Sequence, residues 1–190
     1  MEIREQLSRV LLTSEEAARV DAPGRRDAAV LVPLFVAGGE LHAVFTKRRD
    51  DLSHHPGEIS FPGGRREPAD EDLGATALRE AEEEIGLPRD AVEILGALPA
   101  TPTFVSDYRI LPFVGLIEAG HAWRLQPTEV DEVLELSIPD LIRGYEHKRV
   151  KQIPFRTTTY TVRGSLVWGA TARIVAGLLA RIDRLQGTPG

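Results

Sequence analysis

The sequence contains no cysteine, and this absence removes several classes of function. It excludes disulfide frameworks, thiolate zinc sites and cysteine nucleophiles, and it is compatible with the reducing cytoplasm in which we expect the protein. Long apolar runs are also missing, since no segment approaches the roughly eighteen residues of a membrane span. The N-terminal stretch MEIREQLSRVLL alternates charged with apolar residues, unlike a signal peptide. We therefore expect no membrane partner.

Lysine is scarce, so that arginine supplies almost all of the positive charge. Lys47, Lys148 and Lys151 are the only lysines, and the formal net charge is −6. A net acidic surface argues against nucleic acid as a partner, because affinity for the phosphate backbone comes from clustered positive charge. An anionic small-molecule substrate would need bound metal ions and local arginines, whose planar guanidinium groups form bidentate contacts with phosphate.

Length and composition predict one globular domain over residues 1–190, with 42% hydrophobic and 27% charged residues. Helical spacing of apolar residues predicts an N-terminal helical extension over residues 2–20, in which Ser14 caps a second short helix. The core of the domain is expected over about 28–175. No repeat or linker interrupts it, and no particular oligomeric state is predicted.

Runs rich in β-branched and aromatic residues predict a series of strands. These runs are 28–37, 41–47, 92–98, 110–117, 131–136, 151–155 and 158–163. Gly38 and Gly39 join the first two as a hairpin, while Pro33 indicates an edge strand or a bulge. With a C-terminal helix from about 170 to 185, this order favours an α/β sandwich with a mixed sheet.

The segment LREAEEEIGL crowds acidic residues at the end of a predicted helix over 71–85, with Asp70 as its N-cap. Leu78, Ala81 and Ile85 form the inward stripe, which puts Glu80, Glu83 and Glu84 on more exposed positions. Gly86 stops the helix, so these carboxylates lie at the negative end of the helix dipole, where only Arg79 reaches Glu83 in compensation.

Such crowding usually marks a solvated helix face, but a merely solvated helix would carry lysines at this end. The arrangement instead favours a bound cation that is not one of the protein's own side chains. Carboxylates are the hard oxygen ligands that Mg²⁺ or Mn²⁺ takes together with substrate phosphates.

The stretch from Gly63-Gly64 to REAEEEIGL resembles the signature of the Nudix hydrolases: a glycine, five residues, Glu, seven residues, then Arg-Glu, Glu-Glu and Gly at fixed spacing. One extra residue lies between the glycine and Arg79. We align Glu71, rather than Asp70, with the first glutamate, because a loop absorbs an insertion that would rotate the face of a helix. The resemblance implies a Nudix-type α/β/α sandwich and metal-dependent hydrolysis of a diphosphate.

Within this resemblance each acidic residue has an expected role. Glu80 and Glu84 share one helix face and can hold an ion, and the carbonyl of Gly63 can complete its coordination sphere. Glu83 can hold a second ion, and it is our choice for the catalytic base. Arg79 is expected to restrain the glutamates through a salt bridge.

A second resemblance concerns the segment FTKRRDDLSHHPGEISFPGG, residues 45–64. It is similar to the coenzyme A diphosphatase branch of the family through Thr46, Arg48, Leu52, Gly57 and the Phe-Pro-Gly-Gly turn. LVWGATARI, residues 166–174, resembles the start of the C-terminal helix in that branch. The implied reaction is hydrolysis of coenzyme A and its thioesters to adenosine 3′,5′-bisphosphate and (acyl-)4′-phosphopantetheine.

The expected substrate contacts are Arg48 by motif match, Arg65 and Arg66 by proximity, and Gly64, which lets phosphate approach the backbone. His54 and His55 are further candidates. Two alternatives stay open: hydrolysis of another nucleoside diphosphate derivative, such as ADP-ribose or NADH, and a non-catalytic nucleotide or metal sensor on the same fold.

Overall fold

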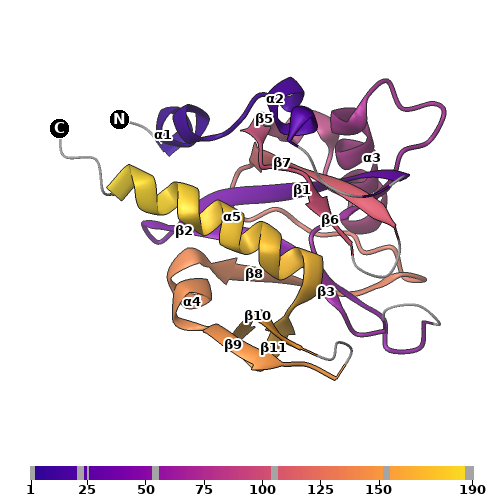
Figure 1. The fold of residues 1–190 in the computed structure, drawn as a ribbon. Helices are drawn as coiled ribbons and strands as arrows, with labels where there is room; N and C mark the ends of the chain where they lie inside the picture. The colour runs from indigo at the N-terminus through magenta and orange to yellow at the C-terminus, as the bar shows by residue number, and fades with distance from the viewer. Residues whose placement is uncertain are drawn as a thin grey trace.

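A mixed β-sheet lies between helices in the computed structural model of the chain (Figure 1). The structure describes residues 3–20, 24, 26–52, 56–103, 107–151 and 155–186. In chain order its elements are α1 (Ile3–Val10), α2 (Ser14–Arg19), β1 (Arg26–Ala37), β2 (Glu40–Arg48), β3 (Ile59–Ser60), β4 (Gly63–Arg65), α3 (Leu73–Ile85), the 3-10 helix η1 (Arg89–Ala91), β5 (Glu93–Ala97), β6 (Thr101–Pro102), β7 (Tyr108–Leu116), β8 (Val130–Ser137), α4 (Ile138–Arg143), β9 (Tyr145–Arg149), β10 (Arg156–Val162), β11 (Ser165–Val167) and α5 (Gly169–Gln186).

The main sheet has eight strands and follows the order β3-β2-β1-β7-β5 along its principal path. Strand β4 pairs with β1, β6 with β7, and β8 with β2. Strands β1 and β7 run parallel, and the other strand pairs that the structure describes are antiparallel. The prediction of an α/β/α sandwich with a mixed sheet is therefore confirmed.

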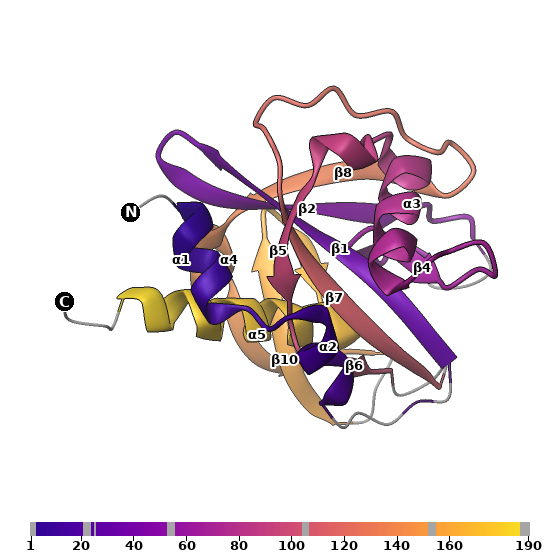
Figure 2. The ribbon, with the colours of Figure 1, turned by 90° about the horizontal axis from the view of Figure 1, so that it is seen from above.

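Two hydrophobic cores fill the spaces on the two faces of the sheet. Ala81 and Ile85 of α3 pack into one core, whereas Leu178 of α5 packs with Leu7 of α1 in the other. Figure 2 shows α3 and α5 on opposite faces of the sheet. No helix in the described part of the chain is both long and apolar enough to cross a membrane.

The Gly38-Gly39 hairpin is confirmed, but the interpretation of Pro33 as an edge or bulge residue is wrong. Pro33 lies in β1, a central strand that pairs with β7 along its length. On its other side, β1 pairs with β4 at 28–30 and with β2 from 34 to 37. Pro33 falls between these two ladders, where its missing N–H costs no hydrogen bond.

Two local predictions need correction. The N-cap of α2 is Thr13, whose hydroxyl accepts from the Glu16 amide, and not Ser14, which is the first helical residue. The strand expected over 151–155 is not observed at Lys151, which lies in a turn, and residues 152–154 lie outside the described residues. The strand in this region is β9, which joins β10 and β11 in a separate three-stranded sheet.

Candidate active site

Helix α3 carries the acidic cluster and ends where the sequence predicts. Gly86 adopts φ 68°, a left-handed conformation that glycine accepts without strain, and its amide donates to the carbonyl of Glu82 at 3.0 Å. The start differs from the prediction. Asp72, not Asp70, is the N-cap, and its side chain accepts from the amide of Ala75 at 2.8 Å.

Asp70 does not cap the helix but binds Arg79, the arginine next to the acidic cluster. Its two carboxylate oxygens accept from Nε and Nη2 of Arg79 at 2.9 and 3.1 Å. The hydroxyl of Thr76 and the amide of Glu67 also donate to it, and together these contacts hold the pKa of Asp70 far below its usual range. Glu71 is exposed and lies before α3, which begins at Leu73, so the expectation that the helix begins at Glu71 is wrong; the alignment of Glu71 with the first glutamate of the signature stays a prediction.

Arg79 connects Asp70 to the glutamates. Its Nη1 lies 3.0 Å from Oε1 of Glu80 and 3.2 Å from Oε2 of Glu83, and its Nη2 donates to the carbonyl of Arg65 at 3.0 Å. The arginine is buried, and its hydrogen bond to Asp70, followed by the charge of Glu80, raises its pKa. The salt bridge expected between Arg79 and Glu83 is therefore present, and Arg79 orients Glu80 as well.

Glu84 is buried, contrary to our expectation of an exposed position. Only 6% of the residue is accessible, and burial raises the pKa of its carboxyl to about 8, with further increases from Glu129 and Glu80. The amide of Gly63 donates to this carboxyl and opposes the shift. Burial arises because the segment after β7 covers the end of α3, where Gln126 donates its amide to the carbonyl of Glu84 at 2.8 Å.

The same segment delivers an acidic residue that sequence reasoning missed. Glu129 follows a turn in which its amide donates to the carbonyl of Gln126 at 3.0 Å. Its carboxylate accepts from Nη1 of Arg48 at 2.8 Å. Glu129 belongs to no recognised motif and lies 45 residues beyond Glu84, so only the folding of this loop brings it to the cluster.

The two glycines of the Pro-Gly-Gly turn each lie close to a different part of the protein. A Cβ added at Gly64 would lie 2.3 Å from Oε1 of Glu80, whereas one at Gly63 would lie 2.3 Å from the carbonyl oxygen of Ala29. Gly64 therefore gives room to the Glu80 carboxylate, and Gly63 gives room to strand β1. Burial raises the pKa of Glu80, and Arg79 opposes this effect.

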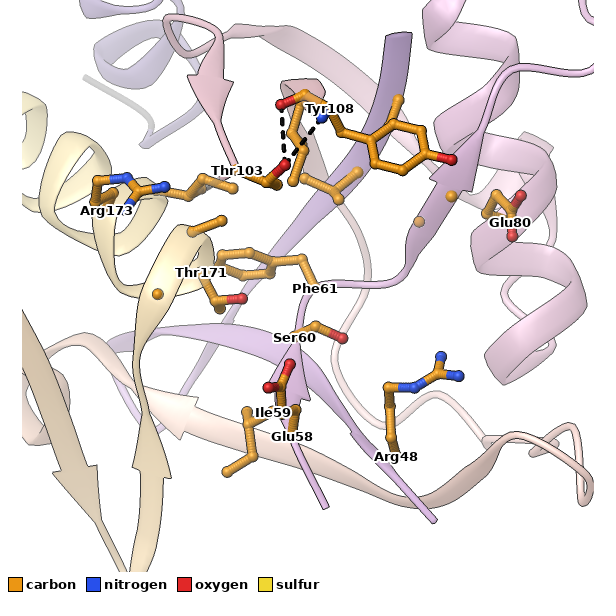
Figure 3. Close-up of a pocket in the computed structure, with 18 of the residues that line it drawn as sticks. Arg48, Glu58, Ile59, Ser60, Phe61, Glu80, Thr103, Tyr108, Thr171 and Arg173 are labelled. Carbon is orange, nitrogen blue, oxygen red and sulfur yellow. Dashed lines mark hydrogen bonds between the residues drawn. The ribbon is translucent and has the colours of Figure 1, made fainter. Parts of the chain in front are cut away.

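A cavity of about 540 Å³ opens beside these carboxylates (Figure 3). Its lining comes from β1, β2, β4, α3, β7, β10, the segment before β4, the residue after β6, the loop after β7, the segment that leads into α5 and the start of α5. The lining residues are Ala28, Val30, Arg48, Glu58, Ile59, Ser60, Phe61, Gly63, Gly64, Arg65, Glu80, Glu84, Thr103, Tyr108, Ile110, Glu129, Thr157, Trp168, Gly169, Ala170, Thr171, Arg173 and Ile174.

The cavity brings together most, but not all, of the predicted site residues. Those that line it are Arg48, Gly63, Gly64, Arg65, Glu80 and Glu84. Glu83, Arg79 and Arg66 do not line it; the Glu83 side chain is 55% exposed. The guanidinium of Arg66 donates to the backbone carbonyls of Asp70 and Glu71, so it braces the loop before α3. His54 and His55 lie outside the described residues.

The donor set of the cavity fits a hard divalent cation. Glu80, Glu84 and Glu129 contribute carboxylate oxygens to one wall, and their mutual repulsion in a buried setting favours a bound positive charge. Among the described residues, no three acidic or histidine side chains converge closely enough to hold a metal ion by themselves. A cation here would therefore combine one or two carboxylates with further oxygens, such as substrate phosphates.

Comparison with known proteins identifies relatives over most of the chain. The family model described as the NUDIX domain matches residues 24–155. "Uncharacterized Nudix hydrolase NudL" of Enterobacter sp. (strain 638) is 34% identical over 188 residues, which cover 93% of this chain and 92% of that protein. "Peroxisomal coenzyme A diphosphatase NUDT7" of Mus musculus is 46% identical over 108 residues, which cover 57% of this chain and 44% of that protein.

Solved structures agree with the fold. An Ap4A hydrolase of C. elegans gives a TM-score of 0.53 at 14% identity and covers 85% of this chain and 98% of that chain. A NUDIX hydrolase of Alicyclobacillus acidocaldarius gives 0.52 at 22% identity, with 82% and 91% covered. At these identities the likeness concerns the fold alone.

Proposed function

The chain belongs to the Nudix hydrolase family and is thus a diphosphatase, and we propose that its substrates are coenzyme A and coenzyme A thioesters. The products would be adenosine 3′,5′-bisphosphate and 4′-phosphopantetheine, or acyl-4′-phosphopantetheine from a thioester. The reaction adds water across one P–O bond of the diphosphate, so two phosphate monoesters leave.

One observation carries this proposal. The segment at 45–64 that resembles the coenzyme A diphosphatase branch contributes a wall of the cavity, through Arg48 and the run from Glu58 to Gly64, directly beside Glu80 and Glu84. The mouse relative, 46% identical over 108 residues, is a coenzyme A diphosphatase. The first of these observations concerns the cavity wall beside the acidic cluster, and the second concerns 57% of the chain.

Different residues are proposed to bind the diphosphate and to activate the attacking water. Glu80 and Glu84, with the carbonyl of Gly63, are proposed to hold Mg²⁺ or Mn²⁺. A divalent cation at this position supplies charge neutralisation of the diphosphate and makes water a stronger nucleophile. The Nε of Arg48 is buried and has no hydrogen-bond partner among the described residues, which makes it a suitable donor to a phosphate oxygen.

The catalytic base remains a prediction with two candidates. We chose Glu83 from the sequence, and its carboxylate lies beside Nη1 of Arg79 but outside the cavity lining. Glu80 lies inside the lining and contacts the same arginine. Glu83→Gln separates them, because loss of the base lowers kcat even when metal and substrate are saturating, and a Glu83→Gln variant with the kcat of the parent would leave Glu80 as the candidate.

The attack is assigned to a phosphorus atom and not to the thioester carbonyl. The sequence has no cysteine, and none of its serines lies in a Gly-x-Ser-x-Gly context. An acyl-coenzyme A substrate should therefore leave as acyl-phosphopantetheine with its thioester intact. Free fatty acid and intact coenzyme A as main products would contradict this assignment.

The test is product identification with the purified protein. Coenzyme A, acetyl-coenzyme A, ADP-ribose and NADH are incubated separately with Mg²⁺ or Mn²⁺ in ¹⁸O-water, and the products are identified by mass spectrometry. The proposal expects the highest kcat/KM for coenzyme A or its thioester, with one ¹⁸O in one of the two phosphates. Faster hydrolysis of ADP-ribose or NADH would assign another nucleoside diphosphate, and absence of turnover with every substrate would favour a non-catalytic sensor.

A further inference from the structure

Three adjacent strands form the floor of the cavity at the end that lies near β4. Ala28 of β1 pairs with Arg65 of β4 on one side and with Ile110 of β7 on the other, and Arg26 pairs with Tyr108. Side chains alternate between the faces of a strand, so Arg26 shares the face of Ala28. Ala28, Arg65, Tyr108 and Ile110 all line the cavity. The small side chain of Ala28 therefore lies between Arg65 and Ile110, two residues along the sheet from the Arg26–Tyr108 pair.

This end of the floor is strongly basic. The Cζ atom of Arg26 lies 5.9 Å from the centroid of the Tyr108 ring, and hydrogen bonding from Arg26 and then Arg65 lowers the pKa of the Tyr108 hydroxyl. No carboxylate of the described residues forms an ion pair with Arg26 or Arg65. Asp27 does not neutralise them, because it points to the opposite face, where it binds Nη2 of Arg109 at 2.9 Å.

The basic end lies next to the carboxylates without overlapping them. Arg65 directly follows Gly64, whose Cα lies beside the carboxylate of Glu80, and Arg65 and Glu80 both line the cavity. Because side chains alternate along a strand, the Arg65 side chain points to the face of β4 opposite to the one at which Gly64 meets Glu80. Figure 3 shows the Tyr108 side chain extending toward the side of the cavity where Glu80 lies, away from Arg173 on α5. An anionic group bound here would thus be close to, but separate from, a diphosphate held at Glu80 and Glu84.

On the premise of the proposed function, we propose that Arg26, Arg65 and Tyr108 form the subsite for the 3′-phosphorylated nucleoside of coenzyme A. The ribose ring separates the 3′-phosphate from the 5′-diphosphate, so the two anionic groups need two separate positions in the cavity, and Arg65 and Tyr108 line it together with Glu80. Two guanidinium groups meet the 3′-phosphate dianion, the Tyr108 ring offers a face to the nucleoside, and Ala28 leaves room between them.

This assignment sets the direction of the substrate in the cavity. With the nucleoside over Ala28, the phosphopantetheine arm runs toward the other end, whose lining includes Phe61, Trp168 and Ile174. Figure 3 places Phe61 and Thr171 at this end, beside α5. An uncharged arm with methyl groups and amides suits a wall of apolar side chains and hydroxyls.

The test compares coenzyme A with dephospho-coenzyme A, which lacks only the 3′-phosphate. For the parent, kcat/KM should favour coenzyme A by about ten- to a hundredfold, as charge-assisted contacts of this kind give. Arg26→Ala and Arg65→Ala should each narrow that ratio by about tenfold, mainly through the KM for coenzyme A. The two kcat/KM values are measured with the same preparation of each variant. A partly unfolded fraction therefore lowers both values equally and leaves their ratio unchanged.

Two controls make the ratio specific to this subsite. Arg109→Ala removes an arginine of the same strands that faces the other way and pairs with Asp27, so the ratio should not change. Arg173→Met removes the arginine at the opposite end of the cavity and should also leave the ratio at the parent value. If Arg173→Met narrows the ratio while Arg26→Ala and Arg65→Ala do not, the 3′-phosphate lies at α5 and the inference is overturned.

A binding measurement separates this inference from the proposed function. Calorimetric titration with adenosine 3′,5′-bisphosphate and with AMP should show tighter binding of the bisphosphate to the parent and equal binding to the Arg26→Ala/Arg65→Ala double variant. Hydrolysis of coenzyme A and dephospho-coenzyme A at equal kcat/KM would leave the function standing and refute the subsite. Hydrolysis of ADP-ribose in preference to both would refute the function itself.

Discussion

Glu84 is the residue whose environment most opposes its charge. It is buried beside Glu129 and Glu80, with the Gly63 amide as a donor. Glu84→Gln keeps the shape of the side chain and removes the cost of holding a carboxyl where burial opposes its ionisation, so metal-free unfolding should need about 1 kcal/mol more free energy. With a divalent cation present, kcat should fall on the order of a hundredfold or more, because a ligand is lost. Denaturant unfolding in chelator and turnover in Mg²⁺ measure the two effects.

The matched control for Glu84 is Glu82→Gln on the same helix. Glu82 is exposed and pairs with Arg89 at 2.8 Å, and its loss should leave both stability and kcat near the parent values. Coenzyme A hydrolysis by Glu84→Gln at the parent rate would show that Glu84 is not a metal ligand.

Asp70 should make stability depend on pH in the acid range. Its folded-state pKa is lowered by Arg79, so its contribution is fully present above the unfolded value of about 4 and is lost as the pH falls. Asp70→Asn should cost roughly 3 kcal/mol at pH 7, because it leaves a buried guanidinium without its carboxylate. The difference between parent and variant should shrink below about pH 4.

Urea unfolding at pH 7 and at pH 3.5 provides the measurement for Asp70. Glu71→Gln is the adjacent control, because Glu71 is exposed and only its backbone carbonyl is used, by Arg66. If Glu71→Gln destabilised the protein as much as Asp70→Asn, the Asp70–Arg79 contact would not explain the stability.

At the scale of elements, the turn between β3 and α3 gives opposite predictions for two neighbouring glycines. A Cβ at Gly63 meets the backbone of Ala29 and Val30, which cannot move without breaking the β1–β4 pairing. A Cβ at Gly64 meets only the end of the Glu80 side chain, which can rotate away. Gly63→Ala should therefore cost roughly 1 to 3 kcal/mol of stability, as overpacking does.

Gly64→Ala should leave thermal stability nearly unchanged and lower kcat by about ten- to a hundredfold, because Glu80 is displaced from its contact with Arg79. Thermal unfolding and turnover of the two variants test the contrast. Equal losses of stability in both would mean that the Glu80 carboxylate is as rigid as the backbone of β1.

Much of the fold could be predicted from local pattern, since the determinants lie close together in the sequence. The hairpin follows from Gly38-Gly39 between two β-rich runs, and α3 stops at Gly86 because only glycine accepts that conformation readily. Strand β9 was missed because Tyr145–Arg149 is largely exposed and charged, and it is a strand through pairing with β10.

The site was predicted less completely, for a physical reason. Helical periodicity predicts that a glutamate lies at an exposed position, so it placed Glu84 on an exposed face of α3. The Glu84 side chain is buried because of the loop after β7, which donates to the backbone carbonyl of Glu84. Glu129 and Tyr108 reach the cavity by tertiary contacts that no spacing encodes. The one-residue insertion could be placed before or after Asp70-Glu71, so the sequence did not predict that Asp70 is the residue that binds Arg79.

For the whole molecule, the ends of the chain meet on the α5 face of the sheet. Helix α1 packs against α5, and Leu12 of the segment after α1 forms a β-bridge with Ala97. Thr171 and Ile174 of α5 line the cavity, so helix α1 supports an element that forms part of the cavity wall. Residues 24–155, which match the family model, contain neither α1 nor α5.

Leu7 should therefore behave as a core residue of the whole domain and not as part of a dispensable extension. Its side chain is fully buried and packs in the same core as Leu178. Leu7→Ala should lower the free energy of unfolding by about 3 kcal/mol, through lost burial and the cavity left behind. Val20→Ala, at an exposed position in the same N-terminal segment, should change it by less than about 0.5 kcal/mol. Chemical denaturation followed by tryptophan fluorescence measures both, and a Leu7→Ala variant as stable as Val20→Ala would show that α1 does not belong to the cooperative core.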